Sequence, residues 1–509
     1  MIDLLRKAVS GMMLMLVLIG MLTLVFNIQP VKASGTLYIR ADGSIYPTTA
    51  PISTVDNVTY TFTDNIYDEI VVERSNITID GNRCTLQGTG TGNGFYLSGI
   101  DNVTIKNTTI KNYEYGIRLY SSSNNTISGN SITANNGQGI RGDSANNNAI
   151  SGNNITANND RAIWFDWSSY NCVSGNNITN NRGGIYLAMS SNNSINGNNI
   201  QANIYEYGVY LSGNFYIGGS SYNSIQGNNI TNNEDGIKLD YSSYNSIFGN
   251  SVTANNRDGI QLCGSSYNSI FGNSVTANNW GIYFYTSCYN NTIYHNNFIN
   301  NTNQVGISYD SVNIWDDGYP SGGNYWSDYN GSDYLYGGPY ENRTGVDGIG
   351  DMPYIVDENN IDYYPLIAPI TVFNAGTWNG TSYNVDVISN STVSAFYFNP
   401  QEGAFLRFNV TGESGTTGLC RVTIPRNLLW VEDGWTVYVG EQSVNYIIIS
   451  DKNSTYLYFT YNHSAKTVKI IGTHVIPEFP QTIIPPLLIL LTTLTVIFQK
   501  RRTRRKLKP

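Results

Sequence analysis

Charged, sulfur-containing and imidazole side chains are scarce in this chain of 509 residues. Asp, Glu, Lys and Arg make up 13% of it, and it contains 5 cysteines and 3 histidines. The cysteines are odd in number and have no C-x-x-C spacing, so they do not predict a disulfide framework or a zinc site. The formal net charge is −9. Nucleic acid is therefore not an expected partner, because its phosphates repel an acidic protein.

Long apolar runs are absent except near the two ends. Arg6 and Lys7 precede an apolar stretch over 8–26, and small residues follow it, so residues 1–33 are predicted to be a secretory signal peptide. Residues 483–498 are apolar and precede a strongly basic end, which predicts a transmembrane helix with a cytoplasmic tail. The body of the chain is expected on the outer face of the cell membrane.

Glycine and asparagine recur at a fixed interval through the middle of the chain. The interval is 22 or 23 residues, with one of 30 between Gly197 and Gly227. Such a period is typical of a solenoid. Each repeat holds three short runs rich in Ile, Val and Thr, which are too short for helices and indicate strands. Each repeat is therefore predicted to form one three-sided coil of a single-stranded parallel β-helix.

The core of this solenoid can be predicted column by column. The three inward columns contain Ile127, Ile150, Val173, Ile195, Ile225, Ile247, Ile270 and Ile293; Ile132, Ile155, Ile178, Ile200, Ile230, Val252, Val275 and Phe298; and Ile117, Ile140, Ile163, Ile185, Val209, Ile237, Ile260 and Ile282. Stacked amides are predicted at one corner, from Asn130, Asn153, Asn176, Asn198, Asn228, Asn250 and Asn273. A tyrosine column, with members such as Tyr222 and Tyr244, is expected to stack for structural reasons.

The S-G-N-x-I-T-x-N-x-x-G-I-x-L pattern resembles the right-handed β-helix repeats of the NosD-like family, within a class that includes carbohydrate-binding proteins and sugar hydrolases. The resemblance covers about half of the chain. It implies a right-handed β-helix over 55–310, after a lead-in at 34–54. The family's name is associated with copper, but His295, His463 and His474 are scattered and offer no soft-ligand copper site. No cofactor is required by this interpretation.

Residues 311–369 are rich in Asp, Gly and Tyr and resemble the segment that often closes NosD-like helices. An end cap is expected there, because the last coil would otherwise expose strand edges and core. The alternative is a calcium site, since loop carboxylates supply the hard oxygen ligands that calcium prefers. The candidate ligands are Asp347, Asp351, Asp357 and Asp362. Their spacing does not match an EF-hand loop.

The remaining segments predict a module and an anchor. Over 370–475, short apolar runs alternate with turns every 8 to 12 positions, which favours an immunoglobulin-like β-sandwich that serves as a stalk. In 476–509 a Pro-Glu-Phe tripeptide precedes the apolar span and the basic end. This order is similar to the PEF-CTERM sorting signal of archaeal surface proteins and implies processing by an archaeosortase; the alternative is a plain membrane anchor. Sequons such as that at Asn330 are predicted glycosylation sites.

Functional residues are expected on the outside of the solenoid. Neighbours on a strand alternate faces, so the third strand of each coil should present an outward column of aromatic and charged residues. Its members are Arg118, Tyr120, Arg141, Asp143, Trp164, Asp166, Tyr186, Tyr210, Lys238, Asp240, Gln261, Tyr283 and Tyr285. Such a face suits an extended glycan. The alternative is that the rings only stabilise the sheet surface.

Catalysis is a weaker hypothesis from the same column. Asp143 and Asp166 should lie about one strand spacing apart, and glycosidases use two carboxyl groups; Arg141 would tune their pKa values. Repetition alone also aligns carboxylates, and no polygalacturonase-like motif set occurs. The sequence therefore favours carbohydrate binding at the envelope. A structural or adhesive surface protein is the second hypothesis, and a glycoside hydrolase or polysaccharide lyase is the third.

Overall fold

The computed structural model describes residues 35–336, 343–378 and 380–476, so the predicted signal peptide and membrane anchor lie outside the described residues. Within those ranges all regular structure is β-strand, and no helix there is long and apolar enough to cross a membrane. The chain divides into two compact units. The first contains the residues up to Ser269 with Ser274–Asn291 and Asn300–Val312, and the second contains Ile270–Asn273, Thr292–Ile299 and the residues from Asn313 onward.

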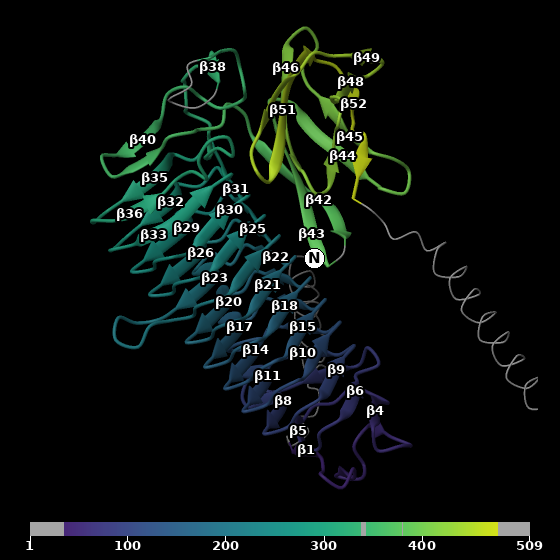
Figure 1. Cartoon of the computed structure of the whole chain (residues 1–509). Coiled ribbons are helices and arrows are strands. Elements are labelled where there is room, and N and C mark those ends of the chain that lie inside the picture. Colours follow the sequence, from purple (N-terminus) through teal and green to yellow (C-terminus); the bar gives the residue numbers. More distant parts are fainter. Residues whose placement is uncertain (1–34, 337–342, 379, 477–509) are drawn as a thin grey trace, which may run out of the picture. The chain divides into compact units, whose positions relative to one another are not determined.

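The first unit is a solenoid in which each coil contributes one strand to each of three parallel sheets (Figure 1). Sheet A has the order β2 (Ile45–Tyr46), β1 (Thr36–Ile39), β5 (Glu69–Val72), β8 (Asn93–Ser98), β11 (Tyr115–Tyr120), β14 (Ile140–Asp143), β17 (Arg161–Asp166), β20 (Gly183–Ala188), β23 (Tyr207–Ser212), β26 (Asp235–Asp240), β29 (Asp258–Cys263), β32 (Trp280–Phe284) and β35 (Asn303–Ile307). All pairings after β1 are parallel, which confirms the predicted β-helix.

The other two sheets have shorter strands. Sheet B contains β3 (Ile52–Ser53), β4 (Thr59–Phe62), β6 (Ile77–Asp80), β9 (Val103–Lys106), β12 (Thr126–Ser128), β15 (Ala149–Ser151), β18 (Cys172–Ser174), β21 (Ser194–Asn196), β24 (Ser224–Gln226) and β27 (Ser246–Phe248). Sheet C contains β7 (Thr85–Gln87), β10 (Thr109–Lys111), β13 (Ser131–Thr133), β16 (Asn154–Thr156), β19 (Asn177–Thr179), β22 (Asn199–Gln201), β25 (Asn229–Thr231), β28 (Ser251–Thr253) and β31 (Ser274–Thr276). The chain crosses between the two units within β30 (Ser269–Phe271), β33 (Tyr289–Tyr294) and β36 (Val312–Ile314).

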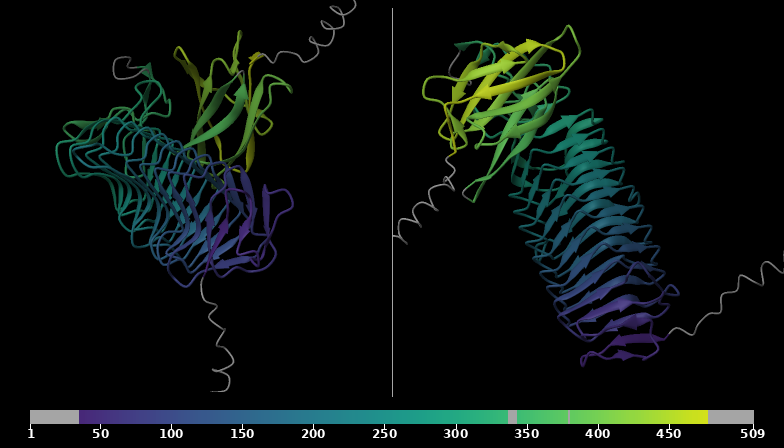
Figure 2. Two further views of the ribbon diagram at one scale, coloured as in Figure 1. Left: turned by 90° about the horizontal axis from the view of Figure 1, so that it is seen from below. Right: turned by 90° about the vertical axis from the view of Figure 1, so that its right-hand side faces the viewer.

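The predicted core columns are confirmed. Ile127 pairs in register with Ile150 and that residue with Val173, and their side chains are fully buried. The same holds for the columns that begin at Ile132 and Ile117. Figure 2 shows the coils stacked along one axis with like strands above one another. Burial of a β-branched column from every coil is the main stabilising term of this unit.

Three amide ladders line the corners, where the sequence analysis predicted one. In the predicted ladder, the backbone N–H of Asn153 donates to Oδ1 of Asn176 at 2.9 Å, while Nδ2 of Asn153 donates to the carbonyl of Ile127 at 2.9 Å. The two further ladders contain Asn125, Asn148, Asn171, Asn193, Asn223, Asn245 and Asn268, and Asn135, Asn158, Asn181, Asn203, Asn233, Asn255 and Asn278. They satisfy backbone groups where the strands end.

The stack of coils begins before residue 55, where the β-helix was predicted to start. Strand β1 already pairs in parallel with β5, and its Leu37 and Ile39 are buried. Strand β2 then turns back antiparallel to β1, so the sheet ends on a short strand. The part of the predicted lead-in that forms β1 and β2 therefore belongs to sheet A, because its alternating apolar residues continue an inward column, while β3 belongs to sheet B.

The second unit carries two five-stranded antiparallel sheets. One has the order β42 (Ile370–Trp378), β43 (Thr381–Ser389), β46 (Thr417–Pro425), β51 (Ser454–Asn462) and β50 (Ile447–Ser450); the other has the order β44 (Thr392–Phe398), β45 (Phe405–Thr411), β52 (Lys466–Ile471), β48 (Thr436–Val439) and β49 (Gln442–Ser443). Both sheets contribute to one hydrophobic core, through residues such as Val422 and Phe408. A solenoid followed by β-sheets is the confirmed part of the predicted fold class.

Short strand pairs complete the second unit. They are β38 (Leu335–Tyr336) with β39 (Arg343–Thr344), β40 (Tyr354–Asp357) with β41 (Asn360–Asp362), and β47 (Leu429–Trp430) with β53 (His474–Val475). Strands β34 (Asn297–Ile299) and β37 (Tyr325–Trp326) pair in parallel and belong to sheet C. A buried arginine, Arg421 of β46, contacts this region: its Nη2 donates to the carbonyl of Pro320, and its guanidinium lies 4.5 Å from the ring centre of Tyr456.

Candidate functional site

The outward column predicted from the sequence is continuous on sheet A. Arg118, Arg141, Trp164 and Tyr186 are paired in register on successive strands from β11 to β20, and the register continues through Tyr210. Each of these residues alternates along its strand with buried Ile, Val, Leu or Phe or, in β14, with Ile140 and the buried Gly142. The alternation explains why the polar and aromatic side chains all reach the same face. We call this surface the sheet A face.

The centre of the sheet A face is a row of cations and rings. The guanidinium of Arg141 lies 4.0 Å from the ring centre of Trp164, and that of Arg161 lies 4.7 Å from Trp164 and 4.8 Å from Tyr186. Trp164 meets Tyr186 edge-on at 5.0 Å, and Tyr186 lies 4.9 Å from Tyr210. Cation–π and aromatic contacts of this kind fix side-chain orientation. The rings and guanidinium groups of the row therefore contact one another without a ligand.

Arg141 brings the two predicted catalytic carboxylates together. It forms a short ion pair with Asp143 and lies 3.4 Å from Asp166; Arg118 lies 3.7 Å from Asp143. Burial raises the pKa of Asp166, although the charge of Arg141 acts in the opposite direction. The carboxylates of Asp143 and Asp166 are thus paired with arginines. This arrangement fits a structural role, in which the carboxylates position Arg141 over Trp164, and it also fits a catalytic pair.

A second polar cluster lies further along the face. The hydroxyl of Tyr210 donates to Asp240, and Nζ of Lys238 lies 3.5 Å from Asp240 and 3.5 Å from the hydroxyl of Tyr207. Burial alone would lower the pKa of Lys238, but Asp240, Tyr207 and Asp235 together outweigh it and raise that pKa. Lys238 therefore stays charged between two aromatic rings, at 5.0 Å from the Tyr207 ring centre.

The ends of the predicted column differ from its centre. Tyr120 and Tyr285 are about half exposed, and Tyr283 contacts both Trp280 and Tyr285. Gln261 was expected on the exposed surface but is only 4% exposed. Its side-chain amide donates to the buried carboxylate of Asp258 on the same strand, and this hydrogen bond keeps the Gln261 side chain away from solvent. Gln261 therefore does not extend the accessible surface.

Three residues that the sequence analysis did not select complete the site. Both oxygens of Glu206 bind arginines: Nε of Arg161 lies 2.8 Å and Nε of Arg182 2.9 Å from them. Glu206 belongs to the inserted segment of the longest repeat, so its contacts reach coils that precede it. Strands of sheet A have up to six residues, so a position before the central column, such as Arg161 in β17, also faces outward.

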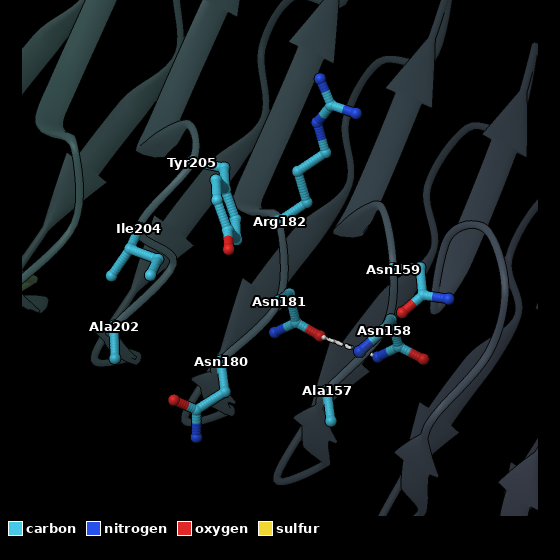
Figure 3. Close-up of a pocket in the computed structure, with 9 residues that line it drawn as sticks. All are labelled: Ala157, Asn158, Asn159, Asn180, Asn181, Arg182, Ala202, Ile204 and Tyr205. Atoms are coloured by element: carbon cyan, nitrogen blue, oxygen red, sulfur yellow. Dashed lines mark hydrogen bonds between the residues drawn. The ribbon is translucent and has the colours of Figure 1, made fainter.

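An open hollow of about 700 Å³ adjoins this cluster at the corner between sheets C and A. Its walls come from three successive coils: Ala157, Asn158, Asn159, Asn180, Asn181, Arg182, Ala202, Ile204 and Tyr205. In Figure 3, Tyr205 and Arg182 lie near each other in the upper part of the view, and the four asparagines lie below them or to their right. The amides of Asn158 and Asn181 already bond each other at 2.8 Å. Arg182 is therefore the charged residue and Tyr205 the aromatic residue that line the hollow.

The predicted calcium ligands lie in the second unit and are used locally. Asp347 accepts from the hydroxyl of Tyr319 at 3.0 Å, Asp351 from the backbone N–H of Tyr334 at 2.7 Å, and Asp362 from Nε1 of Trp326 at 2.9 Å. Asp357 likewise accepts from Asn360. No cluster of three or more His, Cys, Asp or Glu that could hold a metal occurs within 35–336, 343–378 and 380–476.

The fold and the face define a parallel β-helix protein with an aromatic and charged outer sheet. The family model described as "Periplasmic copper-binding protein (NosD)" matches residues 29–213 and 208–331. This match spans more than half of the chain, so the chain belongs to the NosD family. No curated protein matches the sequence.

Several solved β-helix structures are similar. The periplasmic alginate epimerase AlgG shares 15% identity over 55% of this chain and 84% of its own, with a TM-score of 0.33. The A-module of the Azotobacter vinelandii mannuronan C-5 epimerase AlgE4 shares 16% over 56% and 84%, with a TM-score of 0.34. The Dettilon tailspike protein shares 14% over 88% and 97%, with a TM-score of 0.33. Identities and TM-scores this low carry no argument about the chemistry of this chain.

Proposed function

We propose that the protein binds a neutral, extended carbohydrate along the sheet A face, at the outer face of the cell membrane. The observation that carries the proposal is the row Arg141–Trp164–Arg161–Tyr186, which is held in place by ion pairs and opens beside the hollow at Tyr205. Sugars offer apolar CH faces and hydroxyl rims, and a fixed row of rings flanked by polar groups complements both. Preorganisation limits the entropy lost on binding.

The charge pattern supports a neutral glycan over a polyanion. Each arginine on the face has a carboxylate partner: Arg141 pairs with Asp143, and Arg161 with Glu206. A paired arginine keeps N–H groups for hydroxyls, but it offers no net positive field to attract acidic sugars. The formal net charge of −9 would also repel a polyanion.

Copper, which the family description names, is not assigned to this chain. His295 lies beside Asp386, His463 bonds Ser391 and Thr416, and His474 lies beside Glu432. Each histidine of the described ranges thus has a separate environment, so the three imidazoles do not come together as copper ligands. Calcium stays a prediction for the Asp-rich segment.

Binding of the full-length chain to a diverse glycan array, with calcium and with chelator, tests the proposal. We expect selective binding that falls at least about tenfold in Trp164→Ala and in Tyr186→Ala, with the β-sheet circular dichroism unchanged. The matched control is Tyr67→Ala, an exposed tyrosine that precedes β5, four strands from β17 in the order of sheet A, which should bind normally. Folded wild-type protein that binds no glycan in either condition would overturn the proposal and favour a structural or adhesive role.

Hydrolysis or elimination is tested on the same samples. If the protein only binds, the wild type, Asp143→Asn and Asp166→Asn should all leave the bound glycan intact. The affinity of both variants should stay within a few-fold of that of the wild type. New reducing ends or unsaturated products that form with the wild type and disappear in both variants would identify an enzyme instead.

A further inference from the structure

Charge is confined to one side of the solenoid. Between Ser121 and Asn291, every Asp, Glu, Lys and Arg lies on a strand of sheet A or directly precedes one. The corner that leads from sheet A to sheet B, and the outer positions of sheet B, therefore carry no charge through these coils. They contain Ser, Asn, Thr and aromatic residues instead. The strands of sheet C are uncharged in these coils as well. On an acidic protein, such uncharged sides are those on which a like-charged neighbour meets the least repulsion.

The same corner exposes a row of aromatic side chains, which we call the tyrosine stripe: Tyr170, Tyr222, Tyr244, Tyr267 and Tyr289. All five are exposed, Tyr244 by 50%. Tyr222, Tyr244 and Tyr267 stack at 5.2 Å with 7° between ring planes, which confirms the predicted stacking. Because the facing sides of these three rings cover one another, this part of the stripe presents edges and hydroxyl groups.

The insertion in the longest repeat adds an apolar tip beside the stripe. Asn214 and Gly218 exchange two backbone hydrogen bonds, of 2.9 and 3.0 Å, and hold Phe215, Tyr216 and Ile217 between them. These three side chains are 77%, 91% and 61% exposed. Figure 1 shows the loop after β23 extending beyond the neighbouring coils. The ring of Phe215 contacts Tyr241 at 6.2 Å, so the tip is fixed against the corner.

We propose that the tyrosine stripe and this tip form the interface through which two copies of the chain associate side by side. An exposed, uncharged surface rich in Tyr and Phe matches the composition of the cores of protein interfaces. A second copy is the partner that the charge pattern selects, since two acidic chains approach best through their uncharged sides. A two-fold axis across the stripe would place the tip of one copy on the stripe of the other.

The mass of the purified full-length chain in mild detergent, measured across a concentration series by sedimentation, tests this interface. We expect a monomer–dimer equilibrium whose dissociation constant rises at least about tenfold in Tyr244→Glu and in Ile217→Glu. Each change buries a charge at the interface. Ile217 lies at an exposed tip, so its replacement leaves the coils intact even if Tyr244→Glu disturbs the stack. Tyr46→Glu, at another exposed tyrosine of the solenoid, should dimerise as wild type does.

Three results would overturn the interface. The first is a wild type that stays monomeric throughout the series. The second is a dimer that forms equally well in Tyr244→Glu and in Ile217→Glu. The third is a dimer that Tyr46→Glu weakens as strongly as those two substitutions do. Loss of glycan binding in Tyr244→Glu from a monomeric wild type would instead assign the stripe to carbohydrate. Glycan binding through the sheet A face is scored separately, by Trp164→Ala, so failure of one proposal leaves the other standing.

Discussion

Replacing Asp258 by Asn should stabilise the solenoid at neutral and alkaline pH. Asp235 and Asp258 begin adjacent strands of sheet A and are 0% and 4% exposed. The backbone N–H of Asp258 donates to Oδ1 of Asp235 at 3.0 Å, while Oδ2 of Asp235 has no hydrogen-bond partner in the described part of the chain. Burial, and then the charge of Asp235, raises the pKa of Asp258 from 3.8 to about 6.

The sign of the effect follows from which state binds the proton. Below the unfolded pKa of 3.8 the group is neutral in both states and costs nothing. As the pH rises through about 6, the folded protein must ionise a carboxyl that the unfolded chain has already ionised. At about 1.4 kcal/mol for each pKa unit, the loss of stability reaches up to about 3 kcal/mol. Arg257 and Lys238 attract the charged form, and Glu234 raises the pKa of Asp235.

Hydrogen exchange of the peptides covering β26 and β29 measures this locally, in the full-length chain. In the wild type, the free energy of opening should fall between about pH 4 and about pH 8. Asp258→Asn keeps an acceptor oxygen for Gln261 and should raise the opening free energy at about pH 8 by about 2 kcal/mol, with little change at about pH 4. Asp64→Asn, at an exposed carboxylate, is the control. Equal protection of the wild type at both pH values would refute the reasoning.

Three further substitutions test other parts of the structure. Asn176→Ala should cost at least about 2 kcal/mol in solenoid unfolding, because it leaves the carbonyl of Ile150 and the N–H of Asn153 unpaired, whereas exposed Asn154→Ala should cost less than about 1 kcal/mol; similar costs would contradict the ladder's role. Arg421→Met should destabilise the second unit by about 3–5 kcal/mol, since it leaves buried Asp347 without its cation, and Lys469→Met is the less buried control; denaturant unfolding measures both. Arg161→Met should weaken glycan binding several-fold without changing the affinity of the two copies for each other, and an effect on both would show that the two surfaces are coupled.

Most of the solenoid followed from the period of the sequence. A repeat of 22 or 23 residues places Ile150 over Ile127 and Asn176 over Asn153, so one copy of the pattern specifies the contacts of the next. The tyrosine stripe was predictable for the same reason. Two amide ladders were overlooked although their asparagines recur with the same interval, and the first coil was overlooked because its residues do not match the repeat.

The candidate site was predicted less well, because its contacts join residues that no single repeat contains. The sequence placed Trp164, Tyr186 and Tyr210 on one face, since alternation along a strand is local. It did not show that Arg161 would lie over two of these rings, or that Glu206 would reach back to bind Arg161 and Arg182. Those contacts depend on strand length and on the path of the inserted segment.

The sequence by itself determined the architecture and the direction of each outward side chain, because both follow from a short pattern repeated in register. Only the tertiary structure decided which outward residues remain accessible. Gln261 is buried by its bond to Asp258, Trp164 lies near two arginines, and the tip at Tyr216 projects into solvent. Accessibility depends on the contacts that a side chain makes within its own coil and with neighbouring coils, and those contacts form only in the assembled stack.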